Sequence, residues 1–389
     1  MFRAYFDARK NKRNTINQLV FEKCLESNIF ELVNEVLKYQ YIPKSSICFI
    51  VNNPVKREIF AADFRDRVIH HFIYNYISPV FEKTFINDSY SCRLGKGTHY
   101  GIKRIDHFIR SCSQNYTKDC YILKLDIRGY FMAMNKKLLF QKAKQELIKQ
   151  KNKLSFDLPL VLYLIEKTIF NDPTKNCIVK GQKSNWQHLP TDKSLFHAKR
   201  NCGLPIGNLT SQLFGNVYLN EFDHWVKKEL GIKYYGRYVD DFVLIHENKG
   251  YLKFLIPILS NFLHSTLKLD LHPRKIYLQH YTKGVKYLGA MIKPHRIYLG
   301  NRTKGNFYNT LQQYNQIIAR RTPDKDDIQA FQSSMNSYLG IAKHYKTRKI
   351  RKKLIFQHMD NRCWQYVYLL NYDKFVIKPK SRNAVNYVG

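Results

Sequence analysis

The chain has 389 residues, of which 44% are hydrophobic and 14% aromatic, a composition typical of a globular protein with two or three subdomains rather than of a disordered chain. It carries 65 Lys and Arg against 30 Asp and Glu, a formal net charge of +35. This excess predicts a polyanionic partner, and nucleic acid is favoured over an anionic membrane surface. There is no run of about twenty apolar residues and no apolar core of a signal peptide, so a cytoplasmic protein with no membrane partner is expected.

The eight cysteines are scattered and form no Cys-x-x-Cys pair. This spacing indicates neither a zinc ribbon nor a disulfide framework. We interpret them as small buried or half-buried residues.

The N-terminal part of the chain is predicted to be mainly helical. Apolar residues recur at three- and four-residue steps through residues 1–40, Pro43 ends that pattern, and residues 47–51 form a short extended piece. A further helix is predicted from the stripe Phe64, Val68, Phe72 and Tyr76.

Three basic residues, Arg57, Arg65 and Arg67, are expected at or near the start of that helix. Helix starts favour anions, so these arginines are consistent either with a phosphate site or with ordinary surface charge. A glycine-rich loop follows at residues 91–98. It lacks the spacing of a P-loop, and its Arg93 and Lys96 are predicted to contact a sugar-phosphate strand.

Residues 120–131 (CYILKLDIRGYF) predict a buried strand that ends in an acid, Asp126. On its own, Asp126 is also consistent with a helix cap. Residues 135–170 predict helices with a basic exterior, and residues 171–202 predict a long loop. A helix entered through residues 203–212 follows.

Residues 233–246 (KYYGRYVDDFVLIH) predict two strands joined by a tight turn that carries Asp240 and Asp241. A bare Asp-Asp pair is most often a solvated hairpin tip. Two adjacent carboxylates also repel each other and raise a pKa unless cations lie beside them. Pairing of this turn with the strand that ends in Asp126 would bring the acids into one cluster.

The remaining chain is predicted to contain a helix at 251–268, a basic loop running into a strand at 272–278, and a hairpin made of 285–292 and 296–299. Residues 301–389 carry 17 basic and 5 acidic side chains, which predicts a small helical subdomain with a phosphate-facing surface. Its candidate nucleic-acid contacts are Lys343, Lys346, Arg348 and Lys349.

Several of these stretches together resemble reverse transcriptases, in the family's order, from about residue 50 to 300. Tyr238 to Asp241 resemble the Tyr-x-Asp-Asp box, and Leu125 to Phe131 resemble the first catalytic-Asp motif. Lys275 stands where the family has a basic residue, and Tyr287-Leu288-Gly289 resembles the primer grip. The resemblance implies an α+β right-hand polymerase fold, with fingers and palm (an antiparallel sheet plus helices) in residues 1–299 and a helical basic thumb in residues 300–389.

One stretch, Ile206 to Gln212, discriminates within the family. Relatives of group II intron and retron enzymes carry Gln-Gly-x-x-x-Ser-Pro here, whereas this chain has Ile206 and Gln212 at the ends of the motif. That pattern resembles the enzymes of diversity-generating retroelements. The resemblance implies error-prone copying of a template-repeat RNA at adenines, and a small basic accessory protein that forms a barrel-shaped oligomer. It also implies a bacterial or phage-encoded protein.

The resemblance further implies nucleotide addition with two Mg²⁺ ions, with Mn²⁺ as a substitute, because these ions prefer carboxylate oxygens. The implied ligands are Asp126, Asp240, Asp241 and the Ile127 carbonyl, and Lys275 is the implied proton donor or cation near the leaving group. Phe131 matches the steric gate against ribose, and a core phenylalanine is the alternative. The predicted dNTP contacts are Arg57, Arg65, Ile127, Phe131, Ile206, Gly207 and Gln212, and Tyr238 is a predicted nucleic-acid contact.

Three alternatives stay open from the sequence. The first is a retron or group II intron-like enzyme without a mutagenic role, and the second is a catalytically idle RNA-binding protein on the same scaffold. The third is a basic protein of membrane surfaces.

Overall fold

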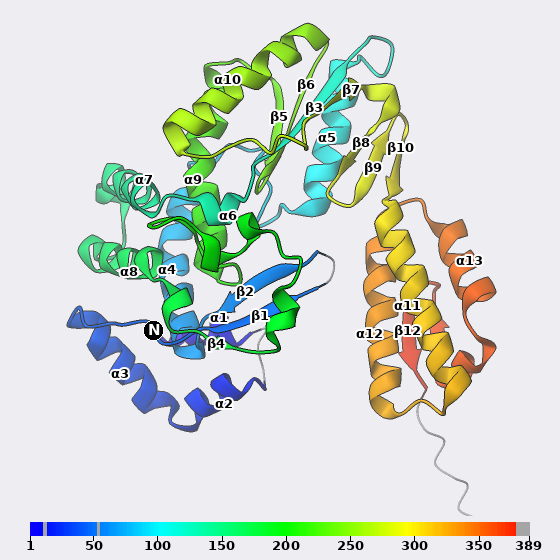
Figure 1. The fold of residues 1–389 in the computed structure, drawn as a ribbon, viewed down its shortest axis with the longest axis horizontal. Coiled ribbons are helices and arrows are strands. Elements are labelled where there is room, and N and C mark those ends of the chain that lie inside the picture. The colour runs from blue at the N-terminus through cyan, green and yellow to red at the C-terminus, as the bar shows by residue number, and fades with distance from the viewer. Residues whose placement is uncertain (11–13, 53–54, 379–389) are drawn as a thin grey trace, which may run out of the picture. The chain divides into compact units, whose positions relative to one another are not determined.

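The computed structural model describes residues 1–10, 14–52 and 55–378 (Figure 1). It divides into two compact units. The first consists of Met1–Gly101 and Tyr121–Gln279, and the second of Ile102–Cys120 and His280–Gly389, of which the described part ends at residue 378. The sequence-based boundary at residue 299/300 therefore falls inside the second unit, which also takes up a segment from the first third of the chain.

A four-stranded sheet forms the centre of the first unit. Its strands are β3 (Tyr121–Asp126), β5 (Tyr234–Tyr238), β6 (Asp241–His246) and β7 (Tyr277–His280), in the order β5-β6-β3-β7. β6 pairs antiparallel with both β5 and β3. The apolar residues that predicted buried strands account for this: Ile122, Leu123, Phe242, Val243 and Leu244 are all fully buried.

Two long helices pack on this sheet, α9 (Leu209–Lys228) and α10 (Lys249–Leu267). Phe222 of α9 lies edge-on to Phe242 of β6, with ring centroids 5.3 Å apart. Trp225 stacks on Phe262 of α10 at 4.2 Å. Phe222 and Trp225 therefore lie on the face of α9 that is turned to the sheet and to α10.

The other helices of the first unit lie where the sequence patterns predicted helices, apart from the short helix Tyr130–Ala133, which was not predicted. They are α1 (Phe2–Arg9), α2 (Ile16–Lys23), α3 (Leu25–Leu37), α4 (Phe64–Glu82), α6 (Tyr130–Ala133), α7 (Lys136–Lys149) and α8 (Leu158–Phe170). α4 begins after Asp63, whose side chain accepts a hydrogen bond from the backbone N–H of Arg65 as an N-cap. Within the described residues, no helix combines the length and the apolarity that crossing a membrane would require.

A second, smaller sheet in the same unit has the order β2-β1-β4, from β1 (Ile47–Val51), β2 (Arg57–Ala61) and β4 (Ile178–Val179). β4 belongs to the segment 171–202, which is rich in loops, in agreement with its composition. The segment also contains four short 3₁₀ helices: Pro173–Lys175, Lys183–Trp186, Thr191–Lys193 and Leu195–His197. Glu58 of β2 holds this segment. Its buried carboxylate accepts hydrogen bonds from the Trp186 indole N–H (3.0 Å), the Ser194 hydroxyl (2.7 Å) and the Leu195 backbone N–H (2.7 Å).

The second unit contains a three-stranded meander and a helical part. β8 (Val285–Tyr287), β9 (Ala290–Lys293) and β10 (Arg296–Leu299) correct the predicted two-part hairpin, because Leu288 and Gly289, at φ +47° and +83°, make a turn inside its first half. The helices α11 (Asn301–Arg320), α12 (Lys325–Ala342) and α13 (Arg348–His358) follow, with a hairpin of β11 (Val367–Leu370) and β12 (Lys374–Ile377) that was not predicted.

The segment 102–120 joins the second unit through α5 (Thr98–Cys112) and the loop after it. The Tyr281 backbone N–H donates to the Cys120 carbonyl (3.0 Å), and its hydroxyl donates to the Tyr116 carbonyl (3.1 Å). The ring of Tyr116 stacks on Tyr281 and lies 4.4 Å from His295. The unit is therefore assembled from two stretches that are far apart in the chain.

Candidate active site

The register of the central sheet brings the predicted acids to one end of it. β3 and β6 pair so that Asp126 stands opposite Asp241. The backbone N–H of Ile127 donates to the Asp240 carbonyl at 3.2 Å. The helix-cap interpretation of Asp126 is wrong, because Asp126 is the last residue of a central strand.

The turn that carries Asp240 is strained. Tyr238 pairs with Asp241, which leaves Val239 and Asp240 as a two-residue hairpin turn. Val239 has φ +56°, a conformation that is uncommon for a β-branched residue and costs about 1–3 kcal/mol. The surrounding structure must therefore hold this turn in place.

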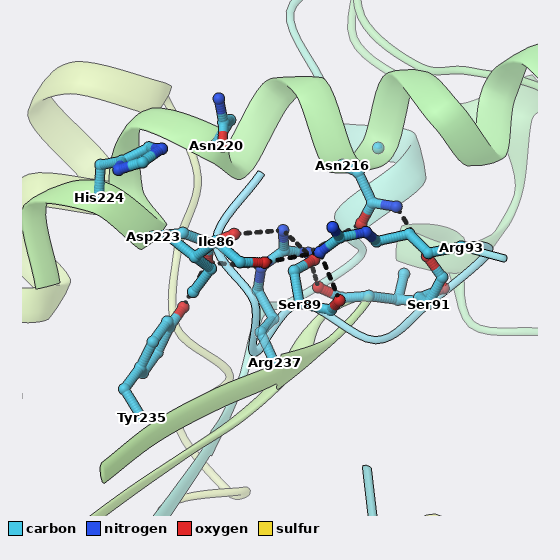
Figure 2. Close-up of polar contacts among 12 residues, drawn as sticks. Ile86, Ser89, Ser91, Arg93, Asn216, Asn220, Asp223, His224, Tyr235 and Arg237 are labelled. Atoms are coloured by element: carbon cyan, nitrogen blue, oxygen red, sulfur yellow. Dashed lines mark hydrogen bonds and ion pairs between the residues drawn. The ribbon is translucent and has the colours of Figure 1, made fainter. Parts of the chain in front are cut away.

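A buried ion pair between Arg237 and Asp223, both labelled in Figure 2, lies next to this turn. Arg237 of β5 and Asp223 of α9 are both fully buried, and the guanidinium donates to both carboxylate oxygens at 2.7 and 2.6 Å. A further N–H of Arg237 donates to the Val239 carbonyl at 2.9 Å. Burial works to lower the pKa of Arg237, but the charge and hydrogen bonds of Asp223 raise it overall. The sequence prediction missed both residues; the available signal was a single charge inside an otherwise apolar strand.

The acids perturb one another. Burial and then the charges of Asp126 and Asp241 raise the pKa of Asp240 to about 6. Burial and Asp126 also raise the pKa of Asp241, although the ammonium of Lys124, 3.2 Å from its Oδ2, works in the opposite direction. The site therefore concentrates negative charge that its own lysines only partly balance, and the solvated hairpin tip is excluded as a description of this turn.

Lys275 supplies one of those cations. Its Nζ donates to both oxygens of Asp126, at 2.8 and 2.9 Å. Burial works to lower the pKa of Lys275, but this contact and the three nearby acids raise it. In the described part of the chain no three Asp, Glu, His or Cys side chains already converge as a metal shell. The donor set nevertheless fits Mg²⁺, because it consists of carboxylate oxygens of neighbouring acids, and burial together with the adjacent negative charges raises the pKa of Asp240 and Asp241.

Some of the predicted nucleotide contacts, among them Phe131, Ile206 and Gly207, lie near one another, close to the start of α9. Phe131 is half-buried on α6, its ring 5.4 Å from that of Tyr130, and Ile206 packs in the same apolar cluster. The Ile206 carbonyl accepts from the Phe60 backbone N–H of β2 at 2.9 Å. Gly207 has φ +124°, and a Cβ there would lie 2.9 Å from Ile59.

The glycine therefore allows close approach of β2, a strand of the same chain. Gln212 is exposed on the first turn of α9, and Ile127 is buried at the exit of β3.

The three arginines predicted near one helix start are separated. Arg57 is exposed in β2, outside the helix. Arg65 is buried and pairs with Glu35, and Arg67 donates from Nε to the Ala62 carbonyl at 2.9 Å. These contacts within the chain remove Arg65 from the set of expected triphosphate ligands, because its guanidinium is committed to a neighbouring helix.

Arg93 and Lys96 are also committed within the chain. Arg93 has only 5% of its side chain exposed and donates to Glu82 at 2.7 Å and to the Ser89 carbonyl at 2.9 Å. Lys96 donates to the side chain of Asn87 at 3.0 Å. The predicted strand contact of Arg93 is therefore corrected: this arginine fastens the loop that contains it.

The remaining predicted nucleic-acid contacts are accessible. Tyr238 is half-buried at the end of β5. In the second unit, four exposed basic residues lie where α12 ends and α13 begins: Lys343, Lys346, Arg348 and Lys349. Arg348 and Lys349 are in the first turn of α13, where the helix dipole disfavours cations and no acid is present. That placement is typical of a surface that binds an anion.

Comparisons with known proteins found similar sequences and structures. Protein YkfC of Escherichia coli (strain K12) is 23% identical over 308 residues, which cover 70% of this chain and 73% of that protein. Among solved structures, telomerase from Candida albicans in complex with the TWJ fragment of telomeric RNA has a TM-score of 0.47 at 12% identity. The match covers 90% of this chain and 61% of the telomerase chain. Apo telomerase from Candida tropicalis has a TM-score of 0.47 at 14% identity, covering 84% and 61%.

This chain thus spans about three fifths of the length of those telomerase chains. The family model for reverse transcriptase (RNA-dependent DNA polymerase) matches residues 42–292, more than half of the chain, and the predicted α+β fold is confirmed. The chain belongs to the reverse transcriptase family, the RNA-dependent DNA polymerases.

Proposed function

We propose that this reverse transcriptase copies a template-repeat RNA into adenine-mutagenised cDNA for a diversity-generating retroelement. The polymerase part of the proposal is carried by one observation: Asp126 and Asp241 stand opposite each other, with Asp240 at the adjoining turn and its pKa raised to about 6. Such a cluster of acids is the donor set that two-metal nucleotidyl transfer requires.

In this proposal, Asp126, Asp240 and Asp241 would hold two Mg²⁺ ions, with the Ile127 carbonyl as a further ligand. Bound there, the ions would supply positive charge against the triphosphate and would lower the pKa of the primer 3′-hydroxyl. Lys275, bound to Asp126, keeps that carboxylate oriented and provides a fixed positive charge near the leaving group. Phe131 limits the space at the sugar, which favours dNTPs over ribonucleotides.

The error-prone part of the proposal is supported by Ile206. Its side chain packs in the apolar cluster with Phe60 and Leu195, which Phe131 also contacts. An apolar side chain at this position offers the incoming nucleotide no hydrogen bond, so pairing geometry is checked less strictly. The exposed basic residues at the start of α13 are proposed contacts for the template and primer in the thumb, and a basic barrel-shaped accessory protein is the proposed partner.

The test is primer extension on RNA with Mg²⁺ and dNTPs, followed by cDNA sequencing, with Asp240→Ala as the control and the accessory protein in a parallel reaction. Errors concentrated opposite template adenines, abolished by Asp240→Ala and reduced by Ile206→Gln, support the proposal. Accurate cDNA would retain the polymerase and exclude the mutagenic role, as expected of a retron or group II intron-like enzyme. No cDNA, even with the partner and the native RNA, would favour an idle RNA-binding protein.

A further inference from the structure

The guanidinium of Arg237 is saturated with hydrogen bonds. An arginine side chain has five N–H donors, and five acceptor contacts surround this one. Nε and Nη2 bind the two oxygens of Asp223, at 2.7 and 2.6 Å. Nη2 also binds the Ser89 hydroxyl at 3.2 Å, and Nη1 binds the Asn216 side-chain carbonyl at 3.4 Å and the Val239 carbonyl at 2.9 Å.

The backbone of Arg237 is fixed as well. Its N–H donates to the Asp88 carbonyl at 2.8 Å, and its carbonyl accepts from the Tyr90 N–H at 2.9 Å. The segment 88–91 thus runs along the outer edge of β5, and Asn216 of α9 fastens it by donating to the Ser91 carbonyl at 2.8 Å. At Gly236 there is no room for a Cβ beside the Tyr90 hydroxyl. Both ends of the arginine are therefore held rigidly.

Stability alone explains this arrangement poorly. Burying an ion pair removes two charges from water, and well-packed apolar residues of the same volume are often as stable or more so. The fork of an arginine is, however, suited to holding several acceptors in fixed directions at once. Four of its five contacts anchor it to α9 and to the 88–91 segment, while the fifth reaches the Val239 carbonyl, which belongs to the peptide that leads into Asp240.

We propose that Arg237 is a positioning residue that fixes the Val239–Asp240 peptide and thereby sets the Asp240 carboxylate against Asp126. Val239 is in a strained left-handed conformation, and the Nη1 contact holds its carbonyl in the direction which that conformation requires. Asp223 orients the guanidinium group of Arg237 through its two hydrogen bonds. This inference rests on the proposed role of Asp240 as a metal-binding carboxylate, and it does not depend on the mutagenic role.

The test compares two variants of the full chain in single-nucleotide incorporation on an RNA template with a DNA primer, across a Mg²⁺ titration. Arg237→Lys keeps the charge, but an ammonium group cannot make the contacts to Asp223 and Val239 together. The expected result is a kcat lower by about 10²-fold, since a displacement of about 1 Å at a reacting group has this effect. The Mg²⁺ concentration for half-maximal rate should rise, while the KM for dNTP and the Kd for template–primer stay within about twofold.

Tyr235→Phe is the matched control. The Tyr235 hydroxyl donates to Asp223 Oδ1 at 2.6 Å, so this variant loses one hydrogen bond of the same buried cluster. It removes no atom of the Arg237 guanidinium or of the Val239–Asp240 turn. It should lower the melting temperature and leave kcat and the Mg²⁺ requirement unchanged. Near-UV circular dichroism gives the folded fraction by which both rates are corrected.

Equal corrected kcat values and equal Mg²⁺ requirements for the two variants would overturn the inference, and so would a loss confined to KM. If Arg237→Lys fails to fold, Ser89→Ala removes one acceptor from the same guanidinium, and a corrected kcat lower by about threefold or more is expected; an unchanged kcat would overturn the inference.

The variant Asp240→Asn shows whether a negative result concerns the metal-binding role of Asp240 or only the positioning role of Arg237. If it still synthesises cDNA, the assignment of Asp240 itself is wrong. If it is inactive while Arg237→Lys is normal, only the positioning role of Arg237 fails.

Discussion

Replacing Glu58 by leucine is expected to release the 171–202 segment from β2. The carboxylate of Glu58 is fully buried and accepts three hydrogen bonds, from Trp186, Ser194 and Leu195. Hydrogen bonds to a charged group each contribute about 1.5–3 kcal/mol, but leucine also relieves the burial of the charge and fills its volume. We therefore expect the free energy of local opening of this segment to fall by about 3 kcal/mol, well below the sum of the three bonds.

Amide hydrogen exchange measures that quantity directly. A loss of about 3 kcal/mol corresponds to roughly 10²-fold faster exchange for the backbone amides of residues 183–198. The amides of β3 and β6 should keep their protection, because these strands pair with each other in the central sheet and the segment itself stays attached to β1 through β4. Glu58→Gln is the control. Its side-chain carbonyl oxygen can still accept the hydrogen bonds of Trp186 and Ser194, so a smaller increase in the amide exchange of residues 183–198 is expected.

The same release should loosen nucleotide selection. Leu195 and Trp186 pack in the apolar cluster that Phe131 contacts, and Phe131 is the proposed steric gate. Incorporation of ribonucleotides relative to dNTPs should therefore rise severalfold in Glu58→Leu, measured as the ratio of the two kcat/KM values. Unchanged exchange in residues 183–198, or an equal increase throughout α9, would refute the reasoning.

Three further predictions follow from other parts of the first unit. Gly207→Ala should lower the free energy of unfolding in urea by about 1–3 kcal/mol, because it combines a left-handed backbone with a contact against β2; Gly95→Ala, with φ +72° but open space, should cost less. Burial lowers the pKa of His70 to about 4, so on acidification the unfolded chain binds a proton at this histidine before the folded chain does. The free energy of unfolding of the wild type should therefore fall by about 2–3 kcal/mol between pH 7.5 and 4.5, and His70→Asn should not show this loss. Equal pH dependence of the two proteins would contradict this. Lys275→Met removes the cation that binds Asp126 and should slow single-nucleotide incorporation by about 10²-fold with little change in template–primer affinity; an unchanged rate would exclude the proposed role.

The sequence was sufficient for features that depend on local pattern and on pairing. The apolar runs around Asp126 and Asp240 predicted two buried strands, and the pairing of those strands confirmed that the acids lie together. The long helices followed from their apolar stripes. Such patterns are strong because a buried face must repeat with the period of its element.

Features that depend on tertiary partners were not predictable in the same way. Arg65 and Arg93 were expected to bind phosphates, but each forms an ion pair with a glutamate of the same chain. The sequence around a basic residue does not show whether the fold will place a carboxylate next to it. Asp223 was overlooked because its partner, Arg237, lies on another element. The turn at Leu288 and Gly289 was missed because the strand residues on both sides are equally apolar.

The discontinuous second unit has a consequence for synthesis of the chain on the ribosome. Residues 102–120 emerge long before Tyr281, the residue against which Tyr116 and Cys120 pack. At ordinary elongation rates the delay is roughly 10–30 s, during which the buried side chains Ile105 and Phe108 of α5 lack their final neighbours. The nascent polymerase thus exposes the apolar face of this amphipathic helix for many seconds, and a chain cut off at residue 279 would lack the part of the second unit that follows it.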